Sequence, residues 1–157
     1  MQSKGNAFMT PRDGVIVVGW VAFVSSLFST QLVRCFGRKT LLLWGHGAIA
    51  LLHAGVAISN IENFDEGVVF STMGFILAYQ LTSGPITYIY ATETTIDAAS
   101  GIIMPALFGT IFVISIVSPI IIDPNVLGPT GTFWILCGIS AAAFIFVAIF
   151  MKETYGL

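Results

Sequence analysis

Five long apolar segments alternate with short polar stretches along this chain. A helix needs about 20 predominantly apolar residues to cross the hydrocarbon core of a bilayer, and each segment is close to that length. The pattern therefore predicts five transmembrane helices, at Val15–Val33, Leu41–Ser59, Val68–Thr92, Ile102–Ile122 and Phe133–Met151. We expect a polar N-terminal segment over residues 1–14 and a five-helix transmembrane domain over residues 15–157.

The apolar segments favour helices over strands. In hydrocarbon every backbone polar group must find a partner within the protein, so only helices and closed barrels span membranes. Membrane strands alternate apolar and polar residues, and the five segments show no such alternation. Gly84-Pro85 interrupts the third segment, where proline removes a backbone donor and predicts a kink. We predict an all-α membrane protein.

The composition agrees with a lipid environment. Hydrophobic residues make up 56% of the 157 residues and charged residues only 9%, whereas about 25% of a soluble domain is charged. No basic run is long enough to follow a phosphate backbone, so we expect no nucleic acid partner. Cys35 and Cys137 have no metal-ligand spacing, and P-loop, nucleophile-elbow and zinc-protease motifs do not occur. We expect neither an enzyme nor a cofactor.

The positive charges predict how the helices cross the membrane. Five spans place the chain ends on opposite sides, and Lys and Arg concentrate on the cytosolic side of membrane proteins. Two basic residues precede the first span, and four fall on the other side, namely Arg34, Arg38, Lys39 and Lys152. We predict that these four face the cytosol of a plasma membrane or the matrix side of a mitochondrial inner membrane. Arg34, Arg38 and Lys39 are also candidates for contact with anionic lipid headgroups.

Four motifs occur in the order and spacing found in one transporter family. They are GRK at 37–39, GPITYIYATE at 84–93, LGPTGTF at 127–133 and KETYGL at 152–157. These resemble the GRR or GRK loop after the eighth helix, the GPxxWxYxxE signature of the tenth, the LGPxGTF start of the twelfth and the closing PETKGL of sugar porters in the major facilitator superfamily. The resemblance covers roughly residues 14–157. It implies helices eight to twelve, about half of a major-facilitator-type fold.

The resemblance implies roles for two sets of residues. If the chain is part of a transporter, four residues would contact substrate, namely Gln80, Gly84, Pro85 and Tyr88, with the Tyr88 ring placed to stack on a sugar. The other set would shape loops and helix ends: Gly37, Arg38, Lys39, Glu93, Gly128, Pro129, Gly131, Glu153 and Gly156. Gln80, Thr82 and Ser83 also form a polar patch that would either face a cavity or hydrogen-bond to neighbouring helices.

Several family positions are changed in this chain. Arg34 stands where the family has an aspartate of an intracellular charge network, and Cys35 where it has an arginine. The arginine expected seven residues after Glu93 is Ser100, so the usual pairing of that glutamate cannot form. Nothing in residues 1–14 matches the amide-rich seventh helix or an N-terminal six-helix bundle.

These observations leave two functions open. The changed positions favour a membrane-embedded accessory or structural subunit of a larger complex, derived from a sugar transporter and not transporting by itself. Its partners would be membrane lipids and other membrane protein subunits. The retained motifs favour a half-transporter that pairs with another half to move sugars. We expect the structural subunit.

Two histidines lie on one face of the second predicted span. His46 and His53 are seven residues apart, which is nearly two helical turns. Ionisable groups inside a membrane would either relay protons or pack as neutral side chains against neighbouring helices. No other span carries a carboxylate partner, which favours packing.

Overall fold

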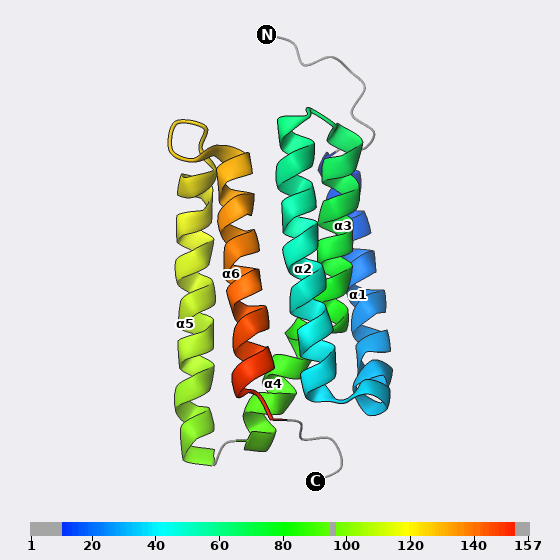
Figure 1. Ribbon diagram of the computed structural model, residues 1–157, viewed down its shortest axis with the longest axis vertical. Coiled ribbons are helices and arrows are strands. Elements are labelled where there is room, and N and C mark those ends of the chain that lie inside the picture. Colours follow the sequence, from blue (N-terminus) through cyan, green and yellow to red (C-terminus); the bar gives the residue numbers. More distant parts are fainter. Residues whose placement is uncertain (1–10, 95–96, 153–157) are drawn as a thin grey trace.

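Six helices account for most of the chain. The computed structural model describes residues 11–94 and 97–152, and within these ranges every regular element is a helix. The long helices run side by side, as Figure 1 shows. They are α1 (Pro11–Phe36), α2 (Arg38–Ile61), α3 (Asp65–Leu81), α4 (Ser83–Thr94), α5 (Asp97–Ile122) and α6 (Gly128–Phe150).

Four of these helices are long and apolar enough to cross a membrane, namely α1, α2, α5 and α6. The remaining two, α3 and α4, together occupy the third predicted segment. The prediction of an all-α membrane protein with about five spans is therefore confirmed. The ends of α1, α4 and α6 and the start of α2 lie at one end of the bundle (Figure 1). We call it the basic end, because it carries Arg34, Arg38, Lys39 and Lys152.

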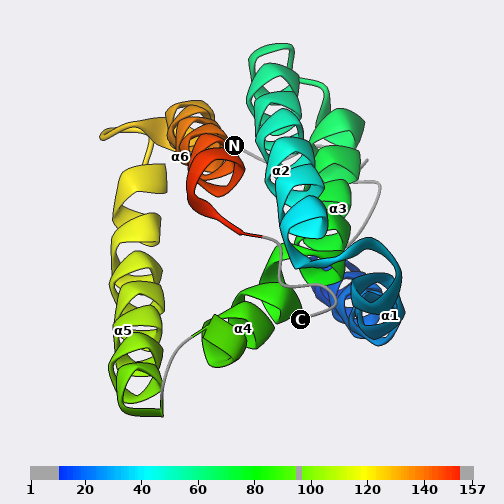
Figure 2. The same ribbon diagram turned by 60° about the horizontal axis from the view of Figure 1, so that its bottom comes forward.

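The third predicted segment is two helices and not one kinked helix, so this prediction was wrong in its detail. The break falls at Thr82, whose φ of −124° and ψ of −82° lie outside the helical region. The ring of Pro85 would clash with the carbonyl of Leu81, four residues earlier, if one helix continued. As the third residue of α4, Pro85 instead occupies a first turn, where its missing N–H has no helical partner to lose. Figure 2 shows α4 leaving the axis of α3 at an angle.

The helices also extend beyond the apolar segments. The first span was expected to begin at Val15, but α1 already includes Pro11–Gly14. Proline suits the first turn of a helix, and the carboxylate of Asp13 there is favoured by the helix dipole. Similarly, α6 begins at Gly128 and not at Phe133, with Pro129 in its first turn. Polar residues at helix ends thus belong to the helices and not to the loops.

Two glycines of the family motifs make the tight turns between helices. Gly37 alone separates α1 from α2, and its φ of 77° is a conformation that glycine adopts readily. Gly128 has a φ of 71° and donates its backbone N–H to the carbonyl oxygen of Asp123 at 3.1 Å. The second hydrogen bond of that turn runs from the Val126 N–H to the same oxygen, at 2.9 Å.

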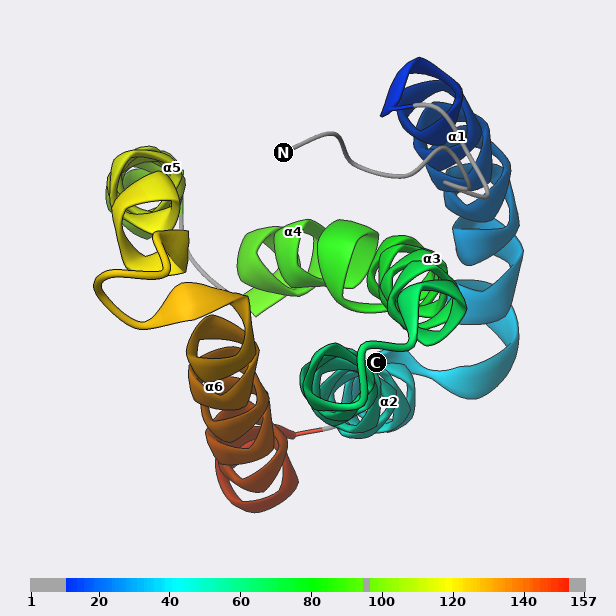
Figure 3. The same cartoon turned by 90° about the horizontal axis from the view of Figure 1, so that it is seen from above.

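Helix α2 is the centre of the bundle. It packs most closely against α6 on one side and α3 on the other (Figure 3). A cluster of buried apolar side chains joins the helices near the basic end: Val33, Leu41, Leu42, Ile86, Val147 and Met151. Helix α5 stands at the edge of the bundle (Figure 3), and none of its membrane-length stretch, Gly101–Ile122, is buried by the described residues.

The closest approach between α2 and the α3–α4 break occurs at Gly45. A Cβ atom placed there would overlap the side chain of Thr82, with 2.6 Å to the Thr82 Cβ. We expect Gly45→Ala to destabilise the bundle by about 1–3 kcal/mol, the usual cost of overpacking a core. Thermal unfolding in detergent measures this loss.

Gly138→Ala is the matched control for that substitution. No atom lies within 4 Å of a Cβ placed at Gly138, and alanine favours helices over glycine. The melting temperature of this variant should be unchanged or higher. Equal melting temperatures for the two variants would contradict the close packing at Gly45.

Candidate functional site

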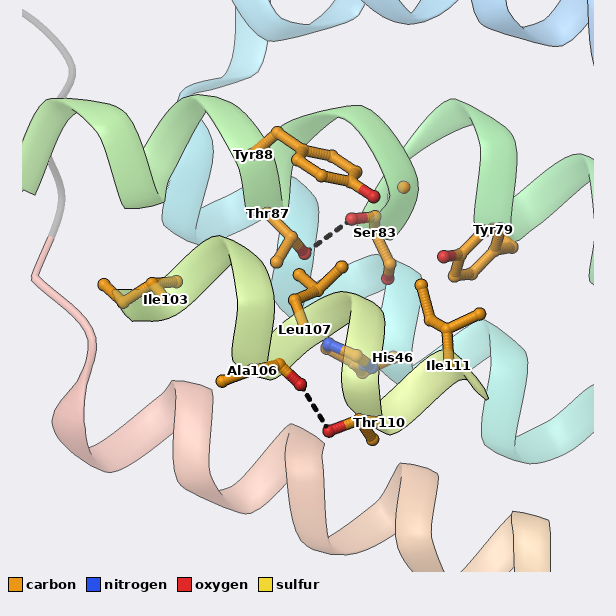
Figure 4. Close-up of a pocket in the computed structure, with 11 residues that line it drawn as sticks. His46, Tyr79, Ser83, Thr87, Tyr88, Ile103, Ala106, Leu107, Thr110 and Ile111 are labelled. Atoms are coloured by element: carbon orange, nitrogen blue, oxygen red, sulfur yellow. Dashed lines mark hydrogen bonds between the residues drawn. The ribbon is translucent and has the colours of Figure 1, made fainter. Parts of the chain in front are cut away.

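A cavity of about 500 Å³ opens between α2, α4 and α5, next to the break that separates α3 from α4. Figure 4 shows it in close-up, with side chains of α4 on one side and of α5 on the other. The lining residues are His46, Tyr79, Ser83, Gly84, Thr87, Tyr88, Ile103, Ala106, Leu107, Thr110 and Ile111. The break positions the polar part of this lining because α4 begins directly at Ser83.

One polar atom of the cavity wall has no partner. The hydroxyl of Ser83 is buried, and Ser83 as a residue is only 4% exposed, yet its Oγ makes no hydrogen bond with any described residue. A buried polar group without a partner costs roughly 1–3 kcal/mol. The Thr87 hydroxyl, in contrast, donates to the Ser83 carbonyl oxygen at 2.6 Å (Figure 4). This Oγ atom is enclosed against α2, 3.3 Å from a Cβ placed at Gly45, so a ligand in the cavity could bond to it only after the Ser83 side chain rotates.

Aromatic and heteroaromatic rings line the same cavity as Ser83. Tyr88 lies five residues further along α4, lines the cavity and is 37% exposed. Tyr79 closes the cavity from the end of α3, and His46 approaches from α2 (Figure 4). These side chains combine ring faces with groups that donate and accept hydrogen bonds. Such a lining suits a ligand with several hydroxyl groups on an apolar frame.

The opposite wall is almost entirely apolar. Ile103, Leu107 and Ile111 of α5 face α4 across the cavity (Figure 4). The Thr110 hydroxyl donates within its own helix, to the Ala106 carbonyl oxygen at 2.8 Å. This wall can exclude water from the cavity, but it offers a ligand few hydrogen bonds.

Two of the four predicted substrate residues line the cavity. Gly84 and Tyr88 do so, whereas Gln80 and Pro85 do not. Gln80 lies just behind the wall, and a Cβ placed at Gly84 would be 3.3 Å from its Oε1. Ser83 was predicted only as a member of a polar patch. Its neighbour in that patch, Thr82, donates instead to the Ala78 carbonyl oxygen at 2.6 Å.

His46, Tyr79 and Thr87 also line the cavity and were not predicted as substrate residues. A signal for Thr87 was available, because it lies four residues after Ser83 on α4 and so shares its face. Nothing in the sequence marked the α5 residues, because the same apolar residue types face lipid and line cavities.

A second cavity of about 520 Å³ lies towards the basic end. It shares three lining residues with the first, namely His46, Thr87 and Ile103. Its remaining lining comes from α2, α4 and α6 and includes Tyr90 and Met151. The two cavities thus lie along one surface of α4, with His46 and Thr87 between them.

An ion pair joins α4 to α2 at the basic end. The Arg38 guanidinium donates from Nη2 to Oε1 of Glu93 at 2.6 Å, a short charge-assisted hydrogen bond. The two side chains are 20% and 32% exposed. The arginine that the family places after Glu93 is replaced by Ser100, and Arg38 of the glycine-containing loop pairs with this glutamate here. The family's usual pairing is thus absent, as its missing arginine implies, and Glu93 pairs with Arg38 in its place.

The remaining motif residues lie at helix ends. Lys39 donates from Nζ to the Ala148 carbonyl oxygen at 3.1 Å and so ties α2 to the end of α6. Arg34 is exposed in the last turn of α1. A Cβ at Gly131 would lie 3.0 Å from Cδ2 of Leu127, which favours glycine in the first turn of α6. Glu153 and Gly156 lie outside the described residues.

The two histidines have different surroundings. His46 lines both cavities, whereas His53 is 5% exposed and packed between helices. The His53 ring centroid lies 4.6 Å from that of Phe75 and 6.0 Å from that of Phe133, and its Nδ1 is 3.4 Å from the Ser140 hydroxyl. His53 therefore packs α2 against α3 and α6. In the described part of the chain, no group of three His, Cys, Asp or Glu side chains is placed to hold a metal ion.

Comparison with known proteins identifies the family. A family model described as "Sugar (and other) transporter" matches residues 6–157. The chain belongs to the sugar transporter family. It is 30% identical over 160 residues to hexose transporter 1 of Plasmodium knowlesi, and that match covers 96% of this chain and 31% of the relative. It is 28% identical over 144 residues to the arabinose-proton symporter of Bacillus subtilis, covering 88% of this chain and 31% of the symporter.

The fold comparison agrees with this family. The solved structure of the major facilitator superfamily proton:xylose symporter XylE, bound to 6-bromo-6-deoxy-D-glucose, is similar with a TM-score of 0.72 at 17% identity. The similarity covers 96% of this chain and 34% of XylE. The chain therefore spans about a third of the length of these relatives, and it has the fold of part of a major facilitator transporter.

Proposed function

We propose that this chain forms one wall of a carbohydrate pathway and moves a sugar or polyol together with a second helical bundle. The observation that carries the proposal is the buried Ser83 hydroxyl, which lacks a partner among the described residues and lines the cavity beside Tyr88. Rotation of the Ser83 side chain into the cavity would let a sugar hydroxyl supply the missing hydrogen bond. Relatives named as hexose, arabinose and polyol transporters support this class of ligand.

The uneven distribution of polar side chains around the cavity supports a second helical bundle as part of the site. Polar side chains are gathered on α4 and at His46, whereas the α5 wall is apolar. A sugar has hydroxyl groups around its whole ring, so a single polar wall satisfies only some of them. Substrate sites of secondary transporters lie between repeats, and alternating access requires one bundle to rock against another. We infer that the second bundle supplies the remaining hydrogen bonds.

The Arg38–Glu93 pair also favours transport over a purely structural role. The sequence alone favoured a structural subunit partly because the usual partner of Glu93 is missing. With Arg38 as its partner at 2.6 Å, Glu93 still holds the end of α4 against α2. This contact lies at the basic end, where a transporter needs a contact that can open and close.

A structural subunit of a larger membrane complex is the second candidate. Helix α5 favours it, because none of Gly101–Ile122 is buried by the described residues. Many large apolar side chains of α5 are exposed, including Ile102, Phe108, Phe112 and Ile116. A helix that is apolar all round lies in lipid or among other helices. In this second function, α5 would pack against another membrane protein subunit.

The experiment that tests transport is uptake of radiolabelled hexose in cells that lack their own hexose carriers. The chain is expressed alone and together with helices one to seven of a related hexose transporter, so that the seventh helix is also present. We expect saturable uptake only when both pieces are present. Absence of uptake, with both pieces in the membrane and the chain migrating in a large complex on a native gel, would favour the structural subunit.

Two serine substitutions refine this test. Ser83→Ala should raise the KM of uptake about fivefold, because one hydrogen bond to substrate contributes about 1 kcal/mol. Ser29→Ala is the matched control, since the Ser29 hydroxyl is likewise buried without a partner among the described residues but lies outside the cavity. Equal effects of the two substitutions would argue against a sugar at Ser83.

A further inference from the structure

We propose that the outer face of the α2–α6 pair binds one anionic phospholipid, with an acyl chain in an apolar groove and its phosphate at Lys39. The groove has a volume of about 500 Å³ and lies apart from the cavities beside α4. Its lining residues come from these two helices only, namely Leu43, Trp44, Gly47, Ala48, Ala50, Leu51, Ala141 and Phe144.

Small residues make the floor of this groove. A Cβ placed at Gly47 would lie 3.5 Å from the ring of Phe144, so the two helices approach closely there. Ala48 and Ala50 add little height, whereas Trp44 and Leu51 are 73% and 76% exposed and stand at the rim. A narrow channel with a smooth floor and raised edges fits a flexible hydrocarbon chain.

Lys39 lies just beyond the groove, on the side of the basic end. It lies one turn before Leu43 on α2, and its Nζ donates to the Ala148 carbonyl oxygen, one turn after Phe144 on α6. Both groove helices therefore meet at this ammonium group. Lys39 has three N–H donors. One bonds to the Ala148 carbonyl oxygen, and the other two can bond to a phosphate. Lys152, two residues beyond α6, adds a second positive charge at the same end.

The length of the groove favours a lipid acyl chain over a transmembrane helix of a partner protein. Leu43 and Leu51 are separated by about 12 Å along α2, which is close to half of the roughly 30 Å hydrocarbon core. A transmembrane partner would follow the whole length of α2 and α6. The residues that line the groove instead reach only to Leu51 on α2 and Ala141 on α6. The groove thus has the depth of one leaflet, and a cation lies just beyond its end.

The test uses quenching of Trp44 fluorescence by brominated lipids. Trp20 and Trp134 are first replaced by phenylalanine, so that Trp44 at the groove rim is the only tryptophan. The chain is reconstituted in vesicles that contain brominated phosphatidylglycerol or brominated phosphatidylcholine with identical acyl chains at equal mole fraction. We expect Trp44 to prefer the anionic lipid about fivefold, the effect of one lysine near a lipid surface.

Lys39→Gln should abolish this preference. Arg12→Gln is the matched control, because it removes one positive charge from the opposite end of the bundle and should leave the preference intact. Gly47→Leu should fill the groove and lower quenching by the anionic lipid, whereas Gly138→Leu, at a position with open space, should not. Equal quenching by both lipids, or a preference that survives Lys39→Gln, would overturn the proposal. Quenching by brominated cholesterol without any preference for the anionic lipid would identify a sterol instead and overturn it too.

Discussion

Hexose uptake by the chain with its second bundle is expected to fall about 30-fold in kcat/KM when Tyr88 is replaced by alanine. Tyr88 lines the cavity from α4, next to Ser83 and Thr87 (Figure 4). Removing an aromatic anchor from a binding site costs about 2 kcal/mol, which corresponds to roughly a 30-fold loss. Initial rates of uptake over a range of hexose concentrations measure the change.

Tyr88→Phe separates the ring from its hydroxyl. This variant keeps the aromatic face and should retain most of the uptake if stacking is the main contribution. Protein levels in the membrane, measured on the same cells, control for folding. If Tyr88→Ala transported within twofold of the parent at equal membrane levels, the cavity beside α4 would not be the sugar site.

Reversing the charge of either Arg38 or Glu93 is expected to give the second large effect. Arg38→Glu and Glu93→Arg each place two like charges where the structure has a 2.6 Å ion pair. Each single variant should lose stability and hexose uptake, because the end of α4 is no longer held against α2. The double variant restores the pair with opposite polarity and should recover a large part of both.

A double-mutant cycle on thermal unfolding isolates the contribution of this pair. We expect a coupling energy of about 1 kcal/mol, since both side chains are partly exposed. The coupling should decrease at high salt, which screens exposed charges. Strictly additive effects of the two single variants would mean that Arg38 and Glu93 act independently.

The number and order of the membrane spans could be predicted from the sequence because lipid imposes a length on each apolar segment. An odd number of spans then places the two ends of the chain on opposite sides of the membrane. Two glycines of the family motifs, Gly37 and Gly128, lie at turns and have positive φ. The helix ends were less predictable, because polar residues such as Arg38 and Lys39 belong to α2 as fully as its apolar residues do.

The site was harder to predict than the spans. Tyr88 and Gly84 were found through a family motif, but the pairing of Arg38 with Glu93 joins residues 55 positions apart. Only the three-dimensional arrangement brings such residues together. A kink was predicted at Gly84-Pro85, whereas the structure has a break at Thr82, next to the position where Pro85 would clash with the Leu81 carbonyl and where Thr82 packs against Gly45.

Thr82 alone separates α3 from α4, so a change in its backbone angles would tilt α4 as a rigid helix. Tyr88 and Glu93 lie six and eleven residues beyond Thr82, or about 9 Å and 16 Å along the helix axis. A rotation of about 10° at Thr82 would move Tyr88 by about 1.6 Å and Glu93 by about 3 Å. The larger displacement is enough to separate Glu93 from Arg38, while the smaller one changes the width of the cavity. A change at one backbone position would thus alter both the width of the cavity and the ion pair at the far end of α4.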